Sequence, residues 1–155
     1  MIIFKSLLFL VFVPGVMAGY VPLALLQRGQ QIETGIFAWL AFPLWLIGGA
    51  ILLWSFWNFF AQGRGTPAPI DPPKELVMVG FYRYTRNPMY VAVLSLIVGH
   101  FFWFGFWNLL IYAAIIFLAF NAFVACYEEP TLRKKFGVAY EDYCKRVPRW
   151  ISPFK

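Results

Sequence analysis

Long apolar runs separated by short polar segments dominate this chain. Two of the runs, residues 6–26 and 35–60, are each long enough for one membrane-spanning helix, because the apolar core of a bilayer requires roughly 20 residues. A third run, residues 88–127, is too long for one span and suits two. Irregular backbone is not tolerated in lipid, so we predict a tight turn at its weakest point, residues 104–108, at the membrane surface. The pattern predicts an all-α protein with about four transmembrane helices.

Composition places the chain among membrane proteins. Hydrophobic residues make up 61% of the 155 residues and charged residues only 13%, and the mean hydropathy is +0.68. A typical soluble domain carries about 25% charged residues. We therefore expect a single integral membrane domain over residues 1–155, with two N-terminal spans in 1–60, a cytoplasmic loop in 61–87, a transmembrane hairpin in 88–127 and a C-terminal cap in 128–155.

The distribution of positive charge predicts the orientation. Of the 13 Lys and Arg residues, only Arg28 falls on the side that holds the first and third connections between the predicted spans. Because cytoplasmic loops carry the excess of Lys and Arg, both termini are expected in the cytoplasm, with the chain crossing a bacterial-type inner membrane several times. A cleaved signal peptide is the alternative, since Val16-Met17-Ala18 resembles a processing site. The weak charge before this stretch and its apolar continuation favour a span.

Two cytoplasmic segments are long enough to build a site, and the first is residues 61–87. It contains a Gly- and Pro-rich run over 63–73 that predicts an extended or turn-forming loop. Residues 76–80 are apolar enough to pack back onto the membrane or the site. A plain connector between helices is usually shorter, so a functional loop is the favoured interpretation and a connector the alternative.

The second segment, residues 128–155, is predicted to begin with a helix break at Pro130. After it, an apolar residue recurs every three or four positions, which predicts an amphipathic helix at the membrane interface that anchors the chain and covers the site. Gly137 would split this helix into two shorter pieces. The apolar stripe consists of Leu132, Phe136, Tyr140, Tyr143 and Val147.

Several kinds of site are excluded by what the chain lacks. A single histidine, His100, rules out a multi-histidine metal site, and Cys126 and Cys144 have neither metal-ligand nor disulfide spacing. The sequence contains no Gly-x-Gly-x-x-Gly fingerprint and no Walker-type phosphate loop, and its pattern of elements is not that of a Rossmann domain. We expect no metal site and no nucleic-acid partner.

The most informative feature is a pair of polar clusters at the two ends of the predicted hairpin. A basic and aromatic cluster, residues 82–90, precedes the hairpin, and Glu128-Glu129-Pro130 follows it. A hairpin would bring Tyr90 close to Glu128 at one membrane surface. A structural ion pair with Arg133 or Arg149 is the alternative for the carboxylates, and contact with lipid headgroups is the alternative for the arginines.

These clusters and several further pieces resemble the isoprenylcysteine carboxyl methyltransferase family and its phospholipid methyltransferase relatives. The resemblance covers roughly residues 63–153, more than half of the chain. Against the family's Arg-His-Pro-x-Tyr-x-Gly element, this chain has Asn87 in place of His and Ala92 in place of Gly, and Asn87 does not titrate near neutrality. The matching pieces are Gly63-Arg64-Gly65-Thr66-Pro67, Gly80-Phe81-Tyr82-Arg83-Tyr84, Arg86-Asn87-Pro88-Met89-Tyr90, Glu128-Glu129, Phe136-Gly137, Tyr140, Tyr143 and Val147-Pro148-Arg149.

The resemblance implies S-adenosylmethionine as cofactor and a lipophilic acceptor from the bilayer as substrate. The cofactor presents ribose hydroxyls, an amino-acid zwitterion and a sulfonium, which suit carboxylates, ion-pair or amide donors, and aromatic faces respectively. Tyr90 or Trp150 is expected to face the sulfonium. The expected catalytic residues are Arg86 and Glu128, and the expected cofactor-binding residues are Asn87, Pro88, Tyr90, His100, Asn121, Glu129, Tyr140, Arg149 and Trp150.

For two of these residues, a purely structural role is the alternative to a role in the site. His100 and Asn121 lie inside predicted spans, where polar side chains are costly and tend to face a partner or a cavity. The alternatives are an interhelical hydrogen bond for Asn121 and an interfacial or packing role for His100.

The reaction implied by the resemblance is transfer of a methyl group from the sulfonium to an acceptor carboxylate, thiol or amine. An amine acceptor would use Glu128 or Glu129 as base, whereas a carboxylate or thiolate acceptor would need none. Two other classes of protein are alternatives to a methyltransferase. One is a membrane reductase with a nicotinamide cofactor, related to the sterol reductases, and the other is a non-catalytic membrane scaffold or small transporter.

Overall fold

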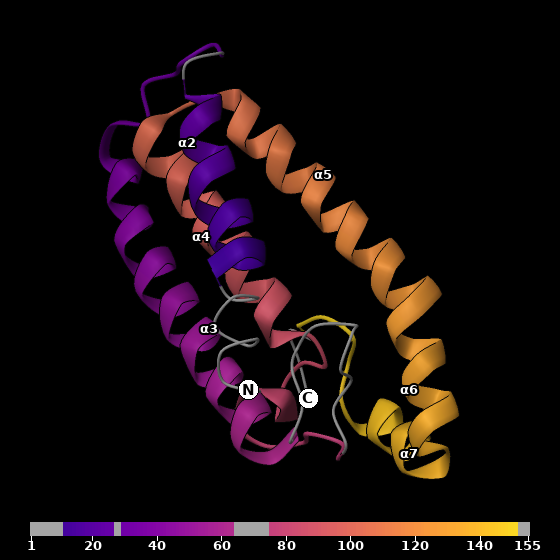
Figure 1. The fold of residues 1–155 in the computed structure, drawn as a ribbon. Helices are drawn as coiled ribbons and strands as arrows, with labels where there is room; N and C mark the ends of the chain where they lie inside the picture. The colour runs from indigo at the N-terminus through magenta and orange to yellow at the C-terminus, as the bar shows by residue number, and fades with distance from the viewer. Residues whose placement is uncertain (1–10, 27–28, 64–74, 152–155) are drawn as a thin grey trace.

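The described part of the chain is built from helices (Figure 1). The computed structural model describes residues 11–26, 29–63 and 75–151, and these ranges contain no strand beyond one isolated bridge between Gln31 and Phe106. The prediction of an all-α protein is confirmed. The α-helices are α2 (Val21–Leu25), α3 (Ala41–Gly63), α4 (Pro88–Phe104), α5 (Trp107–Phe123), α6 (Glu129–Phe136) and α7 (Val138–Arg146). A π-helical segment (Val11–Tyr20) precedes α2, 3-10 turns precede α3 (Gly35–Leu40) and α4 (Gly80–Arg83), and a π-helical turn (Val124–Glu128) joins α5 to α6.

Within the described residues, two continuous helices are long and apolar enough to cross a membrane. They run over Gly35–Asn58 and Trp107–Phe136, whereas the apolar helices Val11–Leu25 and Pro88–Phe104 are shorter. With a rise of 1.5 Å per residue, α4 extends about 26 Å, which is less than the roughly 30 Å of the hydrocarbon core. These helices lie where the hydrophobic runs predict them, but four complete spans stay a prediction.

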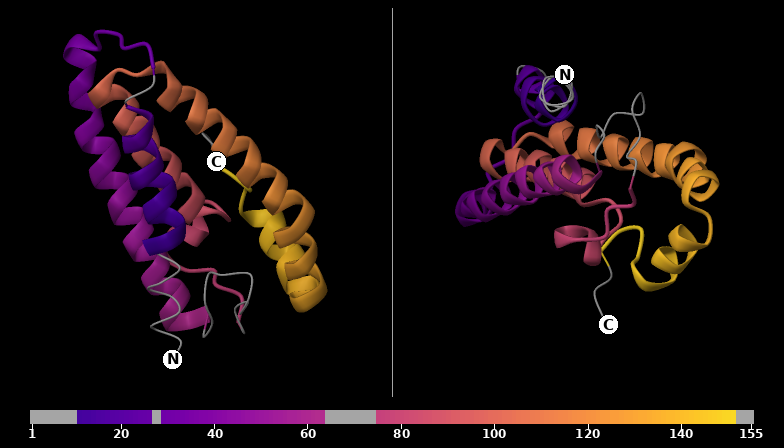
Figure 2. Two further views of the ribbon diagram at one scale, coloured as in Figure 1. Left: turned by 45° about the horizontal axis from the view of Figure 1, so that its top comes forward. Right: turned by 60° about the horizontal axis from the view of Figure 1, so that its bottom comes forward.

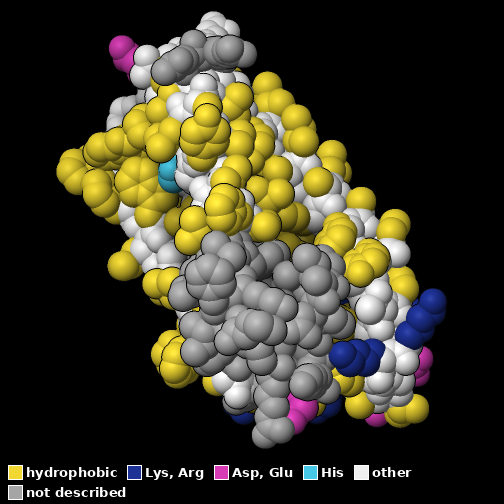
Figure 3. All heavy atoms as spheres, viewed as in Figure 1, with side chains coloured by type: hydrophobic (Ala, Val, Ile, Leu, Met, Phe, Trp, Pro, Cys, Tyr) yellow, Lys and Arg dark blue, Asp and Glu magenta, His cyan; other side chains and the backbone are white. Residues whose placement is uncertain are grey.

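The two long helices expose most of their apolar side chains. Only 11% of the most apolar stretch of the first and 28% of that of the second is buried, and Leu46, Ile111 and Leu118 are more than half exposed. The central helices of soluble proteins bury such residues. On the face drawn in Figure 3, hydrophobic side chains cover the helices, and most charged side chains gather at the end that carries α6 and α7. These features indicate a membrane protein.

The most extensive contact between helices joins α3 and α4, which run side by side in the two views of Figure 2. Gly48 of α3 lies so close to α4 that a Cβ atom on it would sit 3.0 Å from the carbonyl oxygen of Ala92. Ala92 is itself fully buried. Small residues at a helix contact are typical of membrane proteins. This close packing holds α4, and the first turn of α4 carries Pro88 and Tyr90.

The predicted turn within the hairpin is confirmed. Helix α4 ends at Phe104, Gly105 follows in a left-handed conformation with φ of 70°, and α5 begins at Trp107. Glycine suits this position because it has no Cβ atom to clash at positive φ. The carbonyl oxygen of Gly105 accepts a 2.7 Å hydrogen bond from the backbone N–H of Ile32. The start of α4 and the end of α5 therefore lie at the same end of the molecule (Figure 1).

The predicted helix break at Pro130 is wrong. The chain stays helical from α5 through the π-helical turn into α6, and the backbone N–H of Glu129 donates to the carbonyl oxygen of Val124, five residues earlier. Pro130 occupies the first turn of α6, where its fixed φ is tolerated. Because the hydrogen-bond register changes in the π-helical turn, the bond that proline cannot make is dropped there and the helix continues.

The interruption lies instead at Gly137, where φ is 53° and α6 ends before α7 begins. The apolar stripe of these helices packs against the protein, since Tyr140, Tyr143 and Val147 are buried in a cluster that includes Leu76. The predicted split of this amphipathic segment at Gly137 into two shorter helices is confirmed. Their apolar face is used for internal packing and is not left for the bilayer.

The loop predicted over 61–87 is described only in part. Residues 64–74, which hold most of its Gly- and Pro-rich run, lie outside the described residues, as do residues 6–10 of the first predicted span. From residue 75 onward the loop packs back onto the protein, with Val77 buried. Gly80, at φ of 57°, lies directly against Trp54 and Asn58 of α3.

Candidate active site

A hydrogen bond joins the two ends of the hairpin. Tyr90, in the first turn of α4, donates from its hydroxyl group to Oε1 of Glu128 at 2.7 Å. The ring of Phe120 packs against the Tyr90 ring, with centroids 4.4 Å apart. The predicted approach of Tyr90 to Glu128 is confirmed.

Glu129 lies at the centre of an ion-paired cluster. Arg149 donates to both carboxylate oxygens, from Nε at 2.8 Å and from Nη2 at 2.9 Å, and Nη1 of Arg86 lies 3.0 Å from Oε1. Glu129 is only 6% exposed, and a buried carboxylate requires such paired donors to offset its desolvation. The hydrogen bonds to Glu129 raise the pKa of the Arg149 guanidinium. The structural ion pair considered for Arg149 is thus observed, and Arg86 is the second partner.

The two adjacent carboxylates, at the join between the π-helical turn and α6, reach different partners. Successive residues of a helix project about 100° apart. Glu128 therefore points to Tyr90 of α4, while Glu129 points to Arg149 beyond α7. Turns of this kind are frequent at functional sites. The sequence of residues 124–128 carries no signal for a π-helical turn, so this turn could not be predicted.

Residues 147–151, here called the C-terminal strap, are tied to the segment that leads into α4. The backbone N–H of Arg86 donates to the carbonyl oxygen of Pro148 at 3.0 Å. The carbonyl oxygen of Arg149 accepts from Oγ1 of Thr85 at 3.1 Å and from Nδ2 of Asn87 at 2.9 Å. Asn87 and the adjacent Pro88 are buried. The side-chain amide of Asn87 thus holds the strap. The sequence predicted neither this contact nor the part that Thr85 has in it.

Side chains of α7 lie against the cluster from the other side. Nη1 of Arg86 donates to Sγ of Cys144 at 2.8 Å, and the hydroxyl group of Tyr143 donates to the carbonyl oxygen of Tyr82 at 2.7 Å. Burial raises the pKa of Tyr140 and of Tyr143, so both hydroxyl groups stay protonated. Cys144 was not predicted as a site residue. Its spacing of one helical turn from Tyr140 is the signal that places it on the same face.

Trp150 and Asn121, both predicted to bind the cofactor, contact each other. The indole Nε1 of Trp150 donates to Oδ1 of Asn121 at 3.2 Å, and the ring of Phe117 lies 5.3 Å from the Trp150 ring. The strap is thereby joined to α5. The alternative for Asn121 was an interhelical hydrogen bond, but the partner seen here, Trp150, lies in the strap outside the helices.

His100 is not brought to this cluster. It lies ten residues beyond Tyr90 on α4, or about 15 Å along the helix axis. Nδ1 of His100 lies 2.6 Å from the carbonyl oxygen of Leu96 and 3.0 Å from Nε1 of Trp45, and the rings of His100 and Trp45 form an edge contact with centroids 5.4 Å apart. This arrangement favours the packing role that was the alternative for His100.

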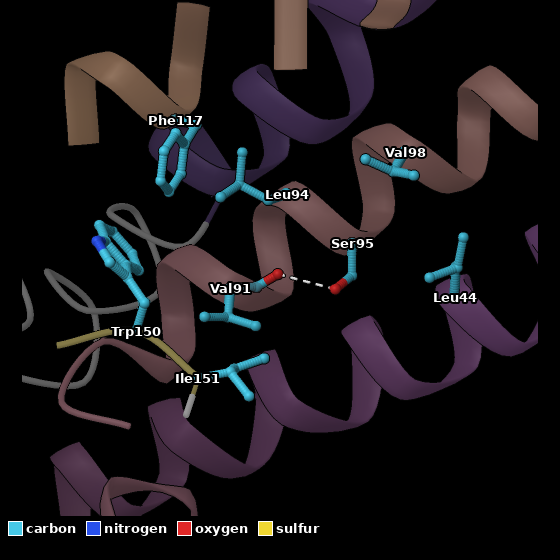
Figure 4. A pocket seen from close by; sticks show the side chains of 8 residues that line it. All are labelled: Leu44, Val91, Leu94, Ser95, Val98, Phe117, Trp150 and Ile151. Carbon is cyan, nitrogen blue, oxygen red and sulfur yellow. Dashed lines mark hydrogen bonds between the residues drawn. The ribbon is translucent and has the colours of Figure 1, made fainter. Parts of the chain in front are cut away.

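An apolar groove lies between helices and includes Trp150 of the strap (Figure 4). It has a volume of about 370 Å³ and is open along the surface. It runs along α4, with α3 on one side and α5 and the strap on the other. The lining residues are Leu44, Val91, Leu94, Ser95, Val98, Phe117, Trp150 and Ile151.

One buried donor at the cluster has no protein acceptor. Among the residues that the structure describes, Nε of Arg86 is buried without a hydrogen-bond partner, although Nη1 of the same side chain is bonded. Buried donors of this kind are rare and call for an explanation. An anionic ligand group would satisfy it, so the residues present fit the carboxylate of an amino-acid-containing cofactor.

The fold and this site define a helical membrane protein that holds paired charges at the end of an apolar hairpin. The family model for phospholipid methyltransferases matches residues 31–139, and this range holds Arg86, Tyr90, Glu128 and Glu129. The chain belongs to the phospholipid methyltransferase family. No solved structure significantly matches it.

Proposed function

We propose that this protein transfers a methyl group from S-adenosylmethionine to a lipophilic acceptor held in the membrane. The observation that carries the proposal is the meeting of Tyr90 with Glu128 beside the ion-paired Arg86 and Glu129, all within the segment that matches the methyltransferase family. The apolar groove that includes Trp150 of the strap suits an acceptor with a hydrocarbon part.

The residues of the cluster divide into those that would contact the cofactor and those that position them. Arg86 would bind the cofactor carboxylate through its unpaired Nε–H, and Glu128 would accept from ribose hydroxyls or the amine. Tyr90 offers an aromatic face for the positive sulfonium. Glu129 already uses both carboxylate oxygens in ion pairs. We therefore assign Glu129 a positioning role, which replaces the cofactor-binding role expected from the sequence.

Orientation and exclusion of water are the main tasks of the protein in this reaction. S-adenosylmethionine supplies a methyl group that is already activated by the sulfonium. Holding donor and acceptor in line can contribute several kcal/mol, and a bound acceptor would displace water from the reacting atoms. With an amine acceptor, the Glu128 carboxylate would take the released proton once Tyr90 turns away. A carboxylate or thiolate acceptor would release none.

The charge distribution supports a cytoplasmic location for the site. The cluster lies at the end of the molecule that carries α6 and α7, where most charged side chains of the viewed face gather (Figure 3). By the positive-inside rule this end faces the cytoplasm, with four spans and both termini on that side. A soluble cofactor would then enter from the cytoplasm and a lipophilic acceptor from the bilayer.

Binding of S-adenosylhomocysteine, which the cofactor becomes after methyl transfer, tests the proposal against binding of NADPH. We expect S-adenosylhomocysteine to bind the purified protein in calorimetry and NADPH not to bind. Transfer of a labelled methyl group should then be found in a screen of prenylated carboxylates, hydrophobic thiols and phospholipid amines. Binding of NADPH alone would indicate a reductase, and binding of neither compound would indicate a scaffold; either result overturns the proposal.

A further inference from the structure

We infer that a basic surface on α6 and α7 binds the phosphate headgroups of anionic membrane lipids. This basic surface consists of Arg133, Lys134 and Lys135 of α6 with Lys145 and Arg146 of α7. Such binding would hold the end of the molecule that carries the site against the bilayer, and it does not depend on the reaction that the protein catalyses.

Positive charge is in excess on these two helices. All five basic side chains are exposed, because the apolar stripe of the helices packs against the protein. Both helices are fully described, and of their three carboxylates Glu129 is buried, so that Glu141 and Asp142 are the exposed ones. Asp142 is already bound by Lys145 at 2.9 Å. Roughly four to eight Lys and Arg residues next to a transmembrane helix are typical of surfaces that bind anionic lipids.

The length of the preceding helix places α6 at the level of lipid headgroups. The continuous helix Trp107–Phe136 has 30 residues and extends about 45 Å at 1.5 Å per residue. Trp107 is 45% exposed, and exposed tryptophans mark the interface between lipid and water. With Trp107 at one interface, a hydrocarbon core of about 30 Å leaves the last third of the helix to cross the opposite headgroup layer. That last third contains Arg133, Lys134 and Lys135.

Exposed side chains of this helix change from aromatic to basic in the order expected for an exit from the bilayer. The rings of Phe123 and Tyr127 stack with centroids 5.2 Å apart, and Tyr127 is 45% exposed. Lys134 follows Tyr127 by seven residues, about two turns, and is also exposed. Tyrosine gathers at the inner edge of the headgroups, and lysine extends its charge outward to the phosphates. This order favours a lipid surface over a soluble anion as the partner.

Lipid bound at this surface would act on the candidate site through α7. Lys145 directly follows Cys144, whose Sγ accepts a hydrogen bond from Arg86 at 2.8 Å. Tyr143, on the same helix, donates to the carbonyl oxygen of Tyr82 at 2.7 Å. Headgroups bound to α7 would therefore restrain the helix that packs on the site.

Lipid retention measures the preference of the basic surface. The protein is placed in nanodiscs that contain equal amounts of anionic phosphatidylglycerol and zwitterionic phosphatidylcholine, and the lipids that stay bound on release are counted by native mass spectrometry. The variant R133Q/K134Q/K135Q removes three charges and keeps good helix formers in α6. The matched control R133K/K134R/K135R keeps all three charges. Glu141→Lys adds positive charge and should act in the opposite direction.

We expect the parent protein to retain phosphatidylglycerol over phosphatidylcholine by roughly tenfold, since each Lys or Arg near an anionic surface contributes up to about fivefold. The preference should fall at least about fivefold in R133Q/K134Q/K135Q, stay within about twofold in the matched control, and rise in Glu141→Lys. Soluble glycerol phosphate, which has the phosphate group without the lipid, should not displace the retained lipid.

Equal retention of the two lipids by the parent protein would overturn the inference. An unchanged preference in both R133Q/K134Q/K135Q and Glu141→Lys, or an equal fall in the matched control, would also overturn it. Displacement by glycerol phosphate would indicate a site for free phosphate compounds and would count against a lipid surface. Thermal melting in detergent shows whether each variant is folded. Calorimetry with S-adenosylhomocysteine tests the proposed function separately, since neither lipid enters that measurement.

Discussion

At the scale of single residues, the adjacent carboxylates Glu128 and Glu129 have different environments. Glu129 is buried and shared by Arg86 and Arg149. Glu128 is only half-buried and accepts a hydrogen bond from Tyr90, a neutral group. The first arrangement holds the strap and the start of α4 together, and the second leaves a carboxylate that a ligand can reach. Substitution of Glu129 should therefore mainly lower stability, whereas substitution of Glu128 should mainly weaken ligand binding.

Replacement of each glutamate by glutamine tests this separation. Glu129→Gln leaves two guanidinium groups without their carboxylate and should lower the free energy of unfolding by about 3 kcal/mol, since breaking a buried ion pair leaves uncompensated charge. Glu128→Gln keeps an acceptor for Tyr90 and should change stability by less than about 1 kcal/mol, while weakening binding of S-adenosylhomocysteine. Denaturant unfolding in detergent micelles and calorimetry measure the two quantities. Equal destabilisation by both variants would contradict the assignment.

At the scale of elements, the sequence predicted the hairpin well because its signals are local. Phe104 to Asn108 interrupt a long apolar run, and Gly105 provides the left-handed residue that ends α4. The π-helical turn was missed, because a change of hydrogen-bond register depends on packing and on Pro130 downstream. For the apolar stripe, anchoring in the membrane and covering the site were both expected, and the structure shows packing against the protein. Periodicity shows that Tyr140 and Tyr143 share a face but does not show whether protein or lipid covers it.

Gly137 sets the angle between α6 and α7, and its replacement tests the folded-back pair. Its φ of 53° with ψ of −128° is a conformation that side chains with a Cβ atom rarely adopt, so Gly137→Ala should destabilise the protein by about 1 to 3 kcal/mol. No neighbouring atom lies within 4 Å of the added Cβ, so the cost arises from the backbone alone. The control is Gly49→Ala in α3, which also has open space but helical geometry and should be neutral or slightly stabilising. The melting temperatures of the two variants in detergent are compared. Equal melting temperatures would contradict the prediction.

At the scale of the whole molecule, the site depends on segments far apart in the chain. Its groups come from three segments: residues 85–90, the part of the long helix where α5 passes into α6, and the strap. These segments meet only because the hairpin folds back and α7 returns the chain to the start of α4. Most residues that the sequence placed in the candidate site lie together, among them Tyr90, Glu128 and Glu129. The sequence misplaced His100, since helical periodicity gives the face of a helix but not the depth at which a ligand lies.

Orientation in the membrane is the property on which access of a soluble cofactor depends, and it can be measured by cysteine labelling. In a background with Cys126→Ser and Cys144→Ser, the exposed Lys145 of α7 would be replaced by Cys to mark the site end, and the exposed Gln30 would be replaced to mark the opposite end. Because Lys and Arg concentrate at the site end, we expect K145C to react with a membrane-impermeant maleimide in inverted inner-membrane vesicles and Q30C to react in spheroplasts. Serine at position 144 keeps an acceptor for Arg86, so the cluster should persist in this background. Reaction of K145C in spheroplasts would place the site outside the cytoplasm and away from any cytoplasmic supply of cofactor.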